Sequence, residues 1–207
     1  MDLHNYLNYL LIAFFTITSP GAAILLAINT AMSLDIRAVF FSTVGNILGL
    51  FMLSSVAMFG VGVLLKTSVI FYTALKIIGA LYLIYLGVMQ MLNRHTKLHL
   101  KKDSVHQKYS FKKVFIKGFL VAVTNPKPIL FFSAIFPLFM EEGKSITLQF
   151  FIMTGTFMAI SFCSLMFYGY ISKSAKAWFF DEQKLKIFYK ISGALFVLMG
   201  IGLAFIP

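Results

Sequence analysis

A short polar segment, Asn125-Pro126-Lys127-Pro128, interrupts one of the most apolar stretches of the chain. Proline lacks an N–H group and its ring crowds the carbonyl four residues earlier, so two prolines here predict a broken helix with unpaired carbonyls. Such carbonyls are tolerated deep in a membrane only where they line a cavity or are buried in protein. The helix that resumes after Pro126 would direct the positive end of its dipole into that cavity, and Lys127 would add a full charge. The segment therefore predicts a polar cavity suited to a carboxylate.

The prolines also constrain the residues beside them. Ser19, Asn125 and Lys127 each precede a proline, and such residues avoid the helical region, so we expect extended backbone at all three. The carbonyls that the prolines free belong to Thr16, Ala122 and Thr124.

Lys127 needs a partner, because an ammonium at the centre of a bilayer costs about 3 kcal/mol on insertion scales. We predict that the partner arrives with the substrate, an anionic or zwitterionic molecule whose carboxylate binds Lys127 and the half-helix ends. The alternative is that the prolines only kink the helix and that Lys127 extends toward the membrane surface. For Pro20 alone, a simple kink is the preferred interpretation. The chain's own carboxylates all lie in predicted loops or termini: Asp2, Asp35, Asp103, Glu141, Glu142, Asp181 and Glu182.

The composition, 59% hydrophobic and 12% charged, is that of an all-α integral membrane protein. A membrane-spanning helix needs about 20 apolar residues. The first run has no cationic segment before it, so we expect it to be retained as a helix. Six runs are long enough: Leu7–Met32, Val39–Leu65, Val69–Leu92, Val114–Met140, Ile146–Ile171 and Ile187–Ile206.

Most of the 18 Lys and Arg residues fall in the first, third and fifth predicted loops. The positive-inside rule then places these loops in the cytoplasm and both termini outside it. A solvated cytoplasmic face explains the basic loop of about 93–113 better than nucleic-acid binding does. His95, His99 and His106 of that loop receive no role, and we predict no metal site and no cofactor.

The two halves of the chain resemble each other. Thr18-Ser19-Pro20 corresponds to Thr124-Asn125-Pro126, and at the same offset Gly49, Phe51, Met52 and Ser55 correspond to Gly155, Phe157, Met158 and Ser161. Each unit has three predicted helices, so the second enters the membrane from the opposite side. We therefore predict a single transporter domain over 1–207, with inverted repeats of about 1–92 and 114–207, and helices 1 and 4 broken at proline near the midplane.

Asn46 lies a few turns inside the second predicted helix, in the stretch Gly45-Asn46-x-x-Gly49. Hydrogen bonding between helices and a role in the site are equally good interpretations of Asn46. Gly45 and Gly49 predict a close helix contact.

These residues resemble the LysE/RhtB family of amino-acid exporters. The resemblance rests on the six helices, Pro20-Gly21, the basic loop and Asn125-Pro126-Lys127-x-x-Leu130-Phe131-Phe132. It implies a transporter, and not an enzyme, that exports amino acids from the bacterial cytoplasm through the plasma (inner) membrane. The resemblance also implies that export is coupled to protons. Whether the protein forms a homo-oligomer stays open. The substrate-binding residues we predict are Thr18, Ser19, Pro20, Gly21, Asn46, Thr124, Asn125, Pro126 and Lys127.

Two positions depart from the family pattern. Pro20-Gly21-Ala22 replaces Pro-Gly-Pro, which softens the first break. Asn46 stands where exporters of basic amino acids have an aspartate, so a neutral substrate of the threonine, homoserine or leucine type is expected. The lost carboxylate leaves Lys127 as a candidate proton carrier.

Other functional classes fit less well. A membrane thiol oxidoreductase needs two cysteines, and the chain has Cys163 alone. An exporter of divalent metal ions is the stronger rival, but it would place carboxylates, His or Cys in the core. Composition alone also leaves a channel or a structural membrane protein open.

Overall fold

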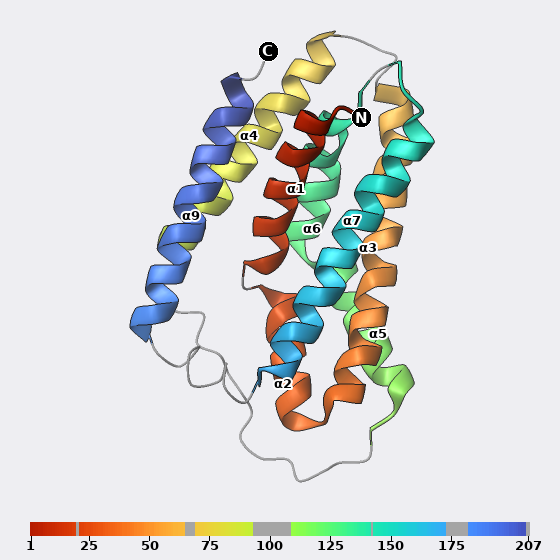
Figure 1. The fold of residues 1–207 in the computed structure, drawn as a ribbon, viewed down its shortest axis with the longest axis vertical. Coiled ribbons are helices and arrows are strands. Elements are labelled where there is room, and N and C mark those ends of the chain that lie inside the picture. The colour runs from red at the N-terminus through yellow and green to blue at the C-terminus, as the bar shows by residue number, and fades with distance from the viewer. Residues whose placement is uncertain (20, 65–68, 93–108, 142, 173–181, 206–207) are drawn as a thin grey trace.

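The computed structural model describes residues 1–19, 21–64, 69–92, 109–141, 143–172 and 182–205, and these residues contain helices and no strands (Figure 1). The predicted all-α class is therefore correct. Pro20 and most of the basic loop, including His95, His99 and His106, lie outside the described residues.

Two pairs of consecutive helices are sharply bent where the sequence predicts breaks. Helices α1 (Leu3–Thr18) and α2 (Ala22–Ser33) meet at 47°. Helix α5 (Phe111–Thr124) meets the segment Pro126–Phe139 at 48°. That second segment changes type along its length, because it consists of α6 (Pro126–Leu130), the π-helix η1 (Phe131–Ile135) and the 3₁₀-helix η2 (Phe136–Phe139).

The backbone at the breaks matches the expectation at two of three positions. Ser19 (φ −65°, ψ 127°) and Asn125 (φ −75°, ψ 121°) are extended, as residues before proline should be. Lys127 is helical instead, so the expectation of an extended residue there was wrong. Pro128 is accommodated because the N–H groups of a first helical turn have no partner within the helix, so its missing N–H costs nothing.

The remaining helices are straight and long. They are α3 (Ile36–Leu64), α4 (Val69–Leu92), α7 (Ile146–Tyr170) and α9 (Glu182–Phe205). Two of them are long and apolar enough to cross a membrane, over Ile36–Met58 and Ile146–Tyr170, and each bent pair would add one span. The apolar parts of α4 and α9 within the described residues are shorter, so six spans stay a prediction.

The first helices of the two bent pairs lie differently: α1 is central in the bundle, and α5 belongs to one flank. In Figure 1, α4 and α9 run side by side along one flank, α1 and α6 lie centrally, and α3, α5 and α7 form the opposite flank. The α3–α5 contact is close, as predicted: a Cβ atom on Gly45 would lie 2.1 Å from the carbonyl oxygen of Phe115. Beside the centre, Tyr9 packs against Phe131, Phe136 and Phe139 in the core.

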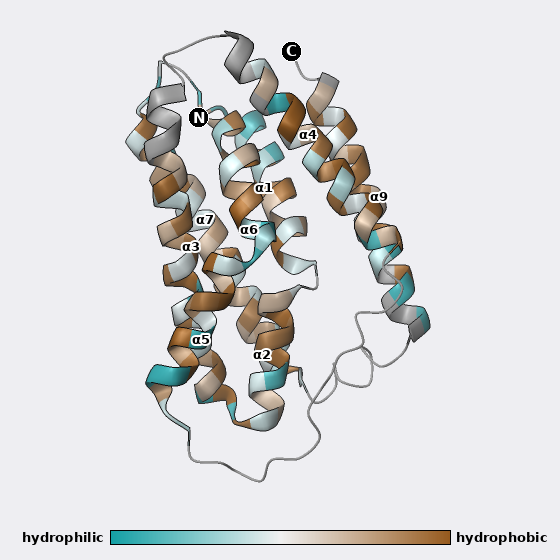
Figure 2. Cartoon of the chain, turned by 180° about the vertical axis from the view of Figure 1, so that it is seen from behind, coloured by the Kyte–Doolittle hydropathy of each residue, from teal (hydrophilic) through white to brown (hydrophobic). Residues whose placement is uncertain are grey.

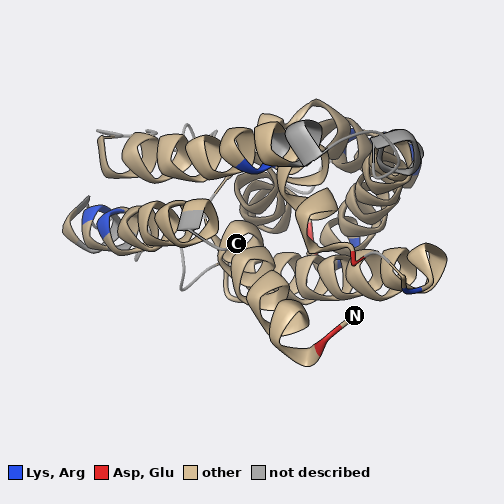
Figure 3. Cartoon of the chain, turned by 90° about the horizontal axis from the view of Figure 1, so that it is seen from above, with Lys and Arg blue, Asp and Glu red and all other residues tan. Residues whose placement is uncertain are grey.

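The bundle has two different ends. At the N-terminal end α1 begins, the chain runs from η2 to α7, and α9 ends (Figure 1). At the opposite end, here called the basic end, α2 is followed by α3 with Arg37 in its first turn, α5 has Lys112 and Lys113 in its first turn, and α9 begins. Figure 2 shows apolar residues along most of each described helix, and Figure 3 shows few charges on them.

Candidate substrate-binding site

Lys127 joins the two breaks directly. Its Nζ donates a hydrogen bond to the carbonyl oxygen of Ser19 at 3.0 Å, across 108 positions of the chain, and lies 5.9 Å from the centroid of the Phe196 ring. No carboxylate among the described residues forms an ion pair with it, since the ion pairs there involve Met1, Asp2, Glu141 and Lys144. The ammonium is thus held by a backbone carbonyl and an aromatic face.

Asn125 positions Lys127 on its helix. Its side-chain oxygen accepts a hydrogen bond from the Lys127 backbone N–H at 3.1 Å and so caps α6. The carbonyl of Ala122, expected to be free, accepts from the backbone N–H of Asn125 at 3.4 Å. The break therefore has fewer unpaired backbone carbonyls than the prolines alone predict. The Lys127 ammonium is its main charged group.

A cavity of about 50 Å³ lies between the two breaks. Of the predicted site residues, Ser19, Gly21, Asn46, Asn125 and Lys127 line it. A cavity of this volume holds about four water molecules at most. It is thus large enough for small polar groups and too small for a whole amino acid in this conformation.

The other predicted residues lie elsewhere. Thr18 lines a neighbouring groove, and its hydroxyl donates to the carbonyl of Phe14 in its own helix. Thr124 is exposed and donates to Leu120 in the same way. Pro126 is exposed and is not among the cavity residues. Pro20 lies outside the described residues.

Polar residues that the sequence did not single out as site residues also line the cavity. Thr16 is 4% exposed, and its hydroxyl has no hydrogen-bond partner among the described residues. A buried hydroxyl without a partner costs about 1–3 kcal/mol, so this one suits a water or a ligand atom. Ser161 lines the cavity too. Thr16 lies one turn before the first break and Ser161 belongs to the repeat match, so the sequence did carry a signal for both.

The most informative residues that sequence reasoning missed are Gln90 and Ser192. Gln90 Nε2 donates to Ser19 Oγ, and Ser192 Oγ donates to Gln90 Oε1 at 2.7 Å. These two side chains come from α4 and α9, which carry no break, so no local pattern marks them.

A larger, mainly apolar groove of about 890 Å³ runs beside the cavity, between α1, α7 and α9. Ser19 lines both hollows. Phe14, Ile160, Phe167 and Leu195 are among the groove's apolar residues. The groove follows the second half of α7 and therefore leads from the break toward the basic end.

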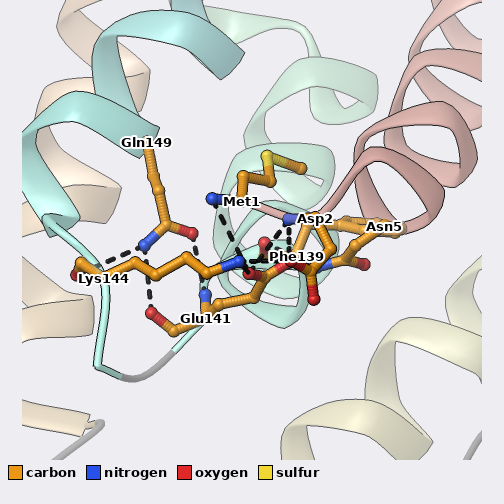
Figure 4. A network of polar contacts seen from close by, with 7 residues as sticks. All are labelled: Met1, Asp2, Asn5, Phe139, Glu141, Lys144 and Gln149. Carbon is orange, nitrogen blue, oxygen red and sulfur yellow. Dashed lines mark hydrogen bonds and ion pairs between the residues drawn. The ribbon is translucent and has the colours of Figure 1, made fainter.

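The N-terminal end is tied together by a polar network of Asp2, Asn5, Glu141, Lys144 and Gln149 (Figure 4), which we call the N-terminal network. The Glu141 carboxylate accepts from the Asp2 backbone N–H at 2.7 Å, from Asn5 Nδ2 at 3.0 Å and from Lys144 Nζ at 2.7 Å. The Gln149 amide bonds to the Glu141 backbone on both sides, at 2.8 and 3.0 Å. The hydrogen bond from Lys144, followed by the one from Asp2, lowers the pKa of Glu141 to about 2.

The described residues contain no group of three or more His, Cys, Asp or Glu side chains that could hold a metal ion. Cys163 lines the groove and is exposed. The candidate site is thus built from one ammonium, hydroxyls, amides and backbone carbonyls.

Apolar helices long enough to cross a membrane, with two bent pairs that meet at a lysine, are features of membrane transporters. The chain belongs to the LysE type translocator family, whose model matches residues 14–206. It is 29% identical over 205 residues to YrhP, an uncharacterised membrane protein of Bacillus subtilis (strain 168), with 96% of this chain and 98% of that protein covered. It is 27% identical over 201 residues to the leucine efflux proteins of Salmonella choleraesuis (strain SC-B67) and Salmonella paratyphi A (strain ATCC 9150 / SARB42), with 97% of this chain and 92% of each covered. No solved structure matches.

Proposed function

We propose that the protein exports a neutral amino acid, of the leucine, threonine or homoserine type, from the bacterial cytoplasm, and that it is not an enzyme. The observation that carries the proposal is the Lys127 ammonium, which lines the cavity at the breaks and has no carboxylate partner among the described residues. A substrate carboxylate would replace the carbonyl of Ser19 as its partner and would be bound more strongly, because the bond joins opposite charges.

Asn46 supports a neutral substrate. It is 4% exposed and lines the cavity. Its amide can form hydrogen bonds with the substrate's ammonium or carboxylate, but it has no negative charge to pair with a cationic substrate side chain. The name of the leucine efflux relatives agrees with a neutral, apolar substrate. The adjoining groove supplies apolar walls near the site.

We further propose the predicted architecture, one transporter domain over 1–207 with inverted repeats and six spans. The two bends are alike, at 47° and 48°, and each lies at the position that the repeat match makes equivalent. Each unbroken second helix also contacts the broken helix of the other repeat, since α3 packs on α5 and α7 contacts α1 and α2, although the α3–α5 contact is much the closer. The basic end would face the cytoplasm and both termini the outside.

Proton coupling is part of the proposal, with Lys127 as the candidate carrier. A homo-oligomer in the bilayer is compatible with it. Export of divalent metal ions is the alternative, and the cavity's ammonium argues against it because a cation repels metal ions.

Proteoliposomes test the proposal. Leucine is expected to move faster than lysine, and an imposed pH gradient should change its rate. Lys127→Met should reduce transport to the level of empty liposomes while the protein still folds. Lys117→Met is the matched control, since Lys117 is exposed on α5 and absent from the cavity. Normal transport by Lys127→Met, or faster transport of lysine than of leucine, would contradict the proposal.

A further inference from the structure

Ser19 occupies the meeting point of four elements. It is 2% exposed and lies in the break between α1 and α2. Its carbonyl accepts from Lys127 of α6, and its hydroxyl oxygen accepts from Gln90 of α4. Gln90 is in turn held by Ser192 of α9. A continuous chain of hydrogen bonds therefore runs from α9 through α4 to the break and on to Lys127.

The direction of these bonds decides what Ser19 can offer a ligand. A hydroxyl has one proton to donate and two lone pairs that accept. Because Gln90 donates to the Ser19 oxygen, the Ser19 proton is available for another acceptor. No described residue receives it in a hydrogen bond within the structure. Ser19 lines both the cavity and the groove, so this proton can be donated to a ligand atom that reaches Ser19.

The orientation of the Gln90 amide depends on Ser192. The Ser192 hydroxyl donates to Gln90 Oε1 at 2.7 Å, so the oxygen end of the amide faces α9 and the NH₂ end faces Ser19. An amide turned the other way would accept the Ser19 proton and remove it from the cavity. The Ser192 hydroxyl also lies 3.5 Å from the carbonyl oxygen of Tyr189, so donation to Gln90 Oε1 is the shorter of its two contacts and supports this orientation of the amide.

The close approach of α4 and α9 brings these two side chains together. A Cβ atom on Gly87 would lie 2.4 Å from the carbonyl oxygen of Gly193, and one on Gly193 would lie 2.6 Å from that of Gly87. The backbones are therefore in contact at this crossing. Gln90 follows Gly87 by one helical turn, and Ser192 precedes Gly193 directly.

We propose that Gln90, oriented by Ser192, is a positioning residue for the substrate carboxylate: it occupies the Ser19 oxygen so that the Ser19 hydroxyl and the Lys127 ammonium bind the carboxylate together. The inference rests on the proposed function, because it requires a carboxylate ligand in the cavity. It adds Gln90 of α4 and Ser192 of α9 to the residues already placed at the site. The neutral amide suits this role, since a carboxylate at position 90 would compete with the substrate for Lys127.

Binding of L-leucine and of L-leucinamide to the purified full chain tests the inference, because leucinamide lacks the carboxylate. Gln90→Met keeps the length of the side chain and removes the donor. It should weaken leucine binding roughly tenfold, because the Ser19 hydroxyl is then no longer held in place to donate to the charged carboxylate. Leucinamide binding should fall less, because its neutral amide oxygen accepts a weaker hydrogen bond than a carboxylate does. Gln90→Glu should weaken leucine binding at least as much.

Ser192 supplies a second, independent pair of variants in case Gln90→Met does not fold. Ser192→Ala should weaken leucine binding, and Ser192→Thr, which retains the hydroxyl, should restore it. Ser133→Ala is the control, since the exposed Ser133 hydroxyl bonds only to Ile129 of its own helical segment.

The outcomes separate the two claims. Unchanged leucine binding in Gln90→Met and Ser192→Ala, with normal binding by the wild type, would overturn the inference and leave the proposed function standing. Equal losses for leucine and leucinamide would also overturn it, because they would indicate a merely structural role. A wild-type protein that binds no leucine would contradict the leucine-type substrate of the proposed function and with it the inference.

Discussion

Asn125 acts on the cavity through the helix that follows it. Its side chain caps α6 by accepting from the Lys127 N–H at 3.1 Å, and its extended backbone forms the break. The cap fixes the first turn of α6, and that turn carries Lys127. The place of the ammonium therefore depends on a neighbour that contributes no charge.

Two substitutions of Asn125 separate capping from charge. Asn125→Ala removes the cap and should lower the free energy of unfolding by about 1 kcal/mol. Asn125→Asp keeps a capping oxygen, so its stability should be near that of the wild type. Its negative charge would compete with the substrate for Lys127, and leucine binding should be weaker in Asn125→Asp than in Asn125→Ala. Calorimetry of unfolding and of leucine binding measures both, and the reverse order of affinities would contradict this division of roles.

Residues at the breaks could be predicted from sequence, and residues that reach the breaks from elsewhere could not. Ser19, Gly21 and Lys127 lie within or beside proline segments, where local chemistry marks them. Gln90 and Ser192 lie in helices without a break, and their role depends on how α4 packs against α9. That packing is a tertiary feature, which one sequence does not specify.

Helix packing shows the same limit at the scale of elements. The repeat match makes Gly49 of α3 and Gly155 of α7 equivalent, yet their surroundings differ. A Cβ atom on Gly49 would lie 2.6 Å from the Cβ of Ala122 and 3.0 Å from the carbonyl oxygen of Phe119. A Cβ atom on Gly155 would meet nothing within 4 Å. The helices themselves could be predicted from the sequence. Which of the two glycines lies at a close helix contact could not, and neither could the change to π and 3₁₀ geometry after Leu130.

This pair of glycines gives a matched test of the packing. Gly49→Ala should lower the free energy of unfolding by about 1–3 kcal/mol, because the added methyl group pushes α3 away from α5. Gly155→Ala should be neutral or stabilising by up to about 1 kcal/mol, since alanine favours a helix more than glycine does. Thermal unfolding in detergent measures both changes. Equal effects of the two substitutions would show that α3 and α5 are not in contact at Gly49.

At the scale of the whole molecule, a polar network closes the N-terminal end of the bundle. The N-terminal network joins the start of α1 to the segment before α7 and to α7 itself. The groove of about 890 Å³ leads from the breaks toward the basic end. In the proposed orientation the N-terminal end faces away from the cytoplasm, and a transporter that opens each side in turn is then expected to break the N-terminal network when the site opens at that end.

Glu141 is the centre of this closure, and its pKa sets the pH range over which the closure holds. Because the folded protein lowers that pKa to about 2, the carboxylate's contribution is fully present above its unfolded pKa, about 4.3, and is lost as the pH falls toward 2. Glu141→Gln should therefore lower the midpoint of thermal unfolding by a constant amount between pH 5 and 8, and the difference from wild type should shrink below about pH 4. Hydrogen exchange should also become faster at the start of α1 in Glu141→Gln. Lys117→Gln, which changes a charge outside the network, is the control and should do neither. A difference that grew as the pH fell from 8 to 5 would contradict the assignment, because it would require Glu141 to titrate near neutral pH.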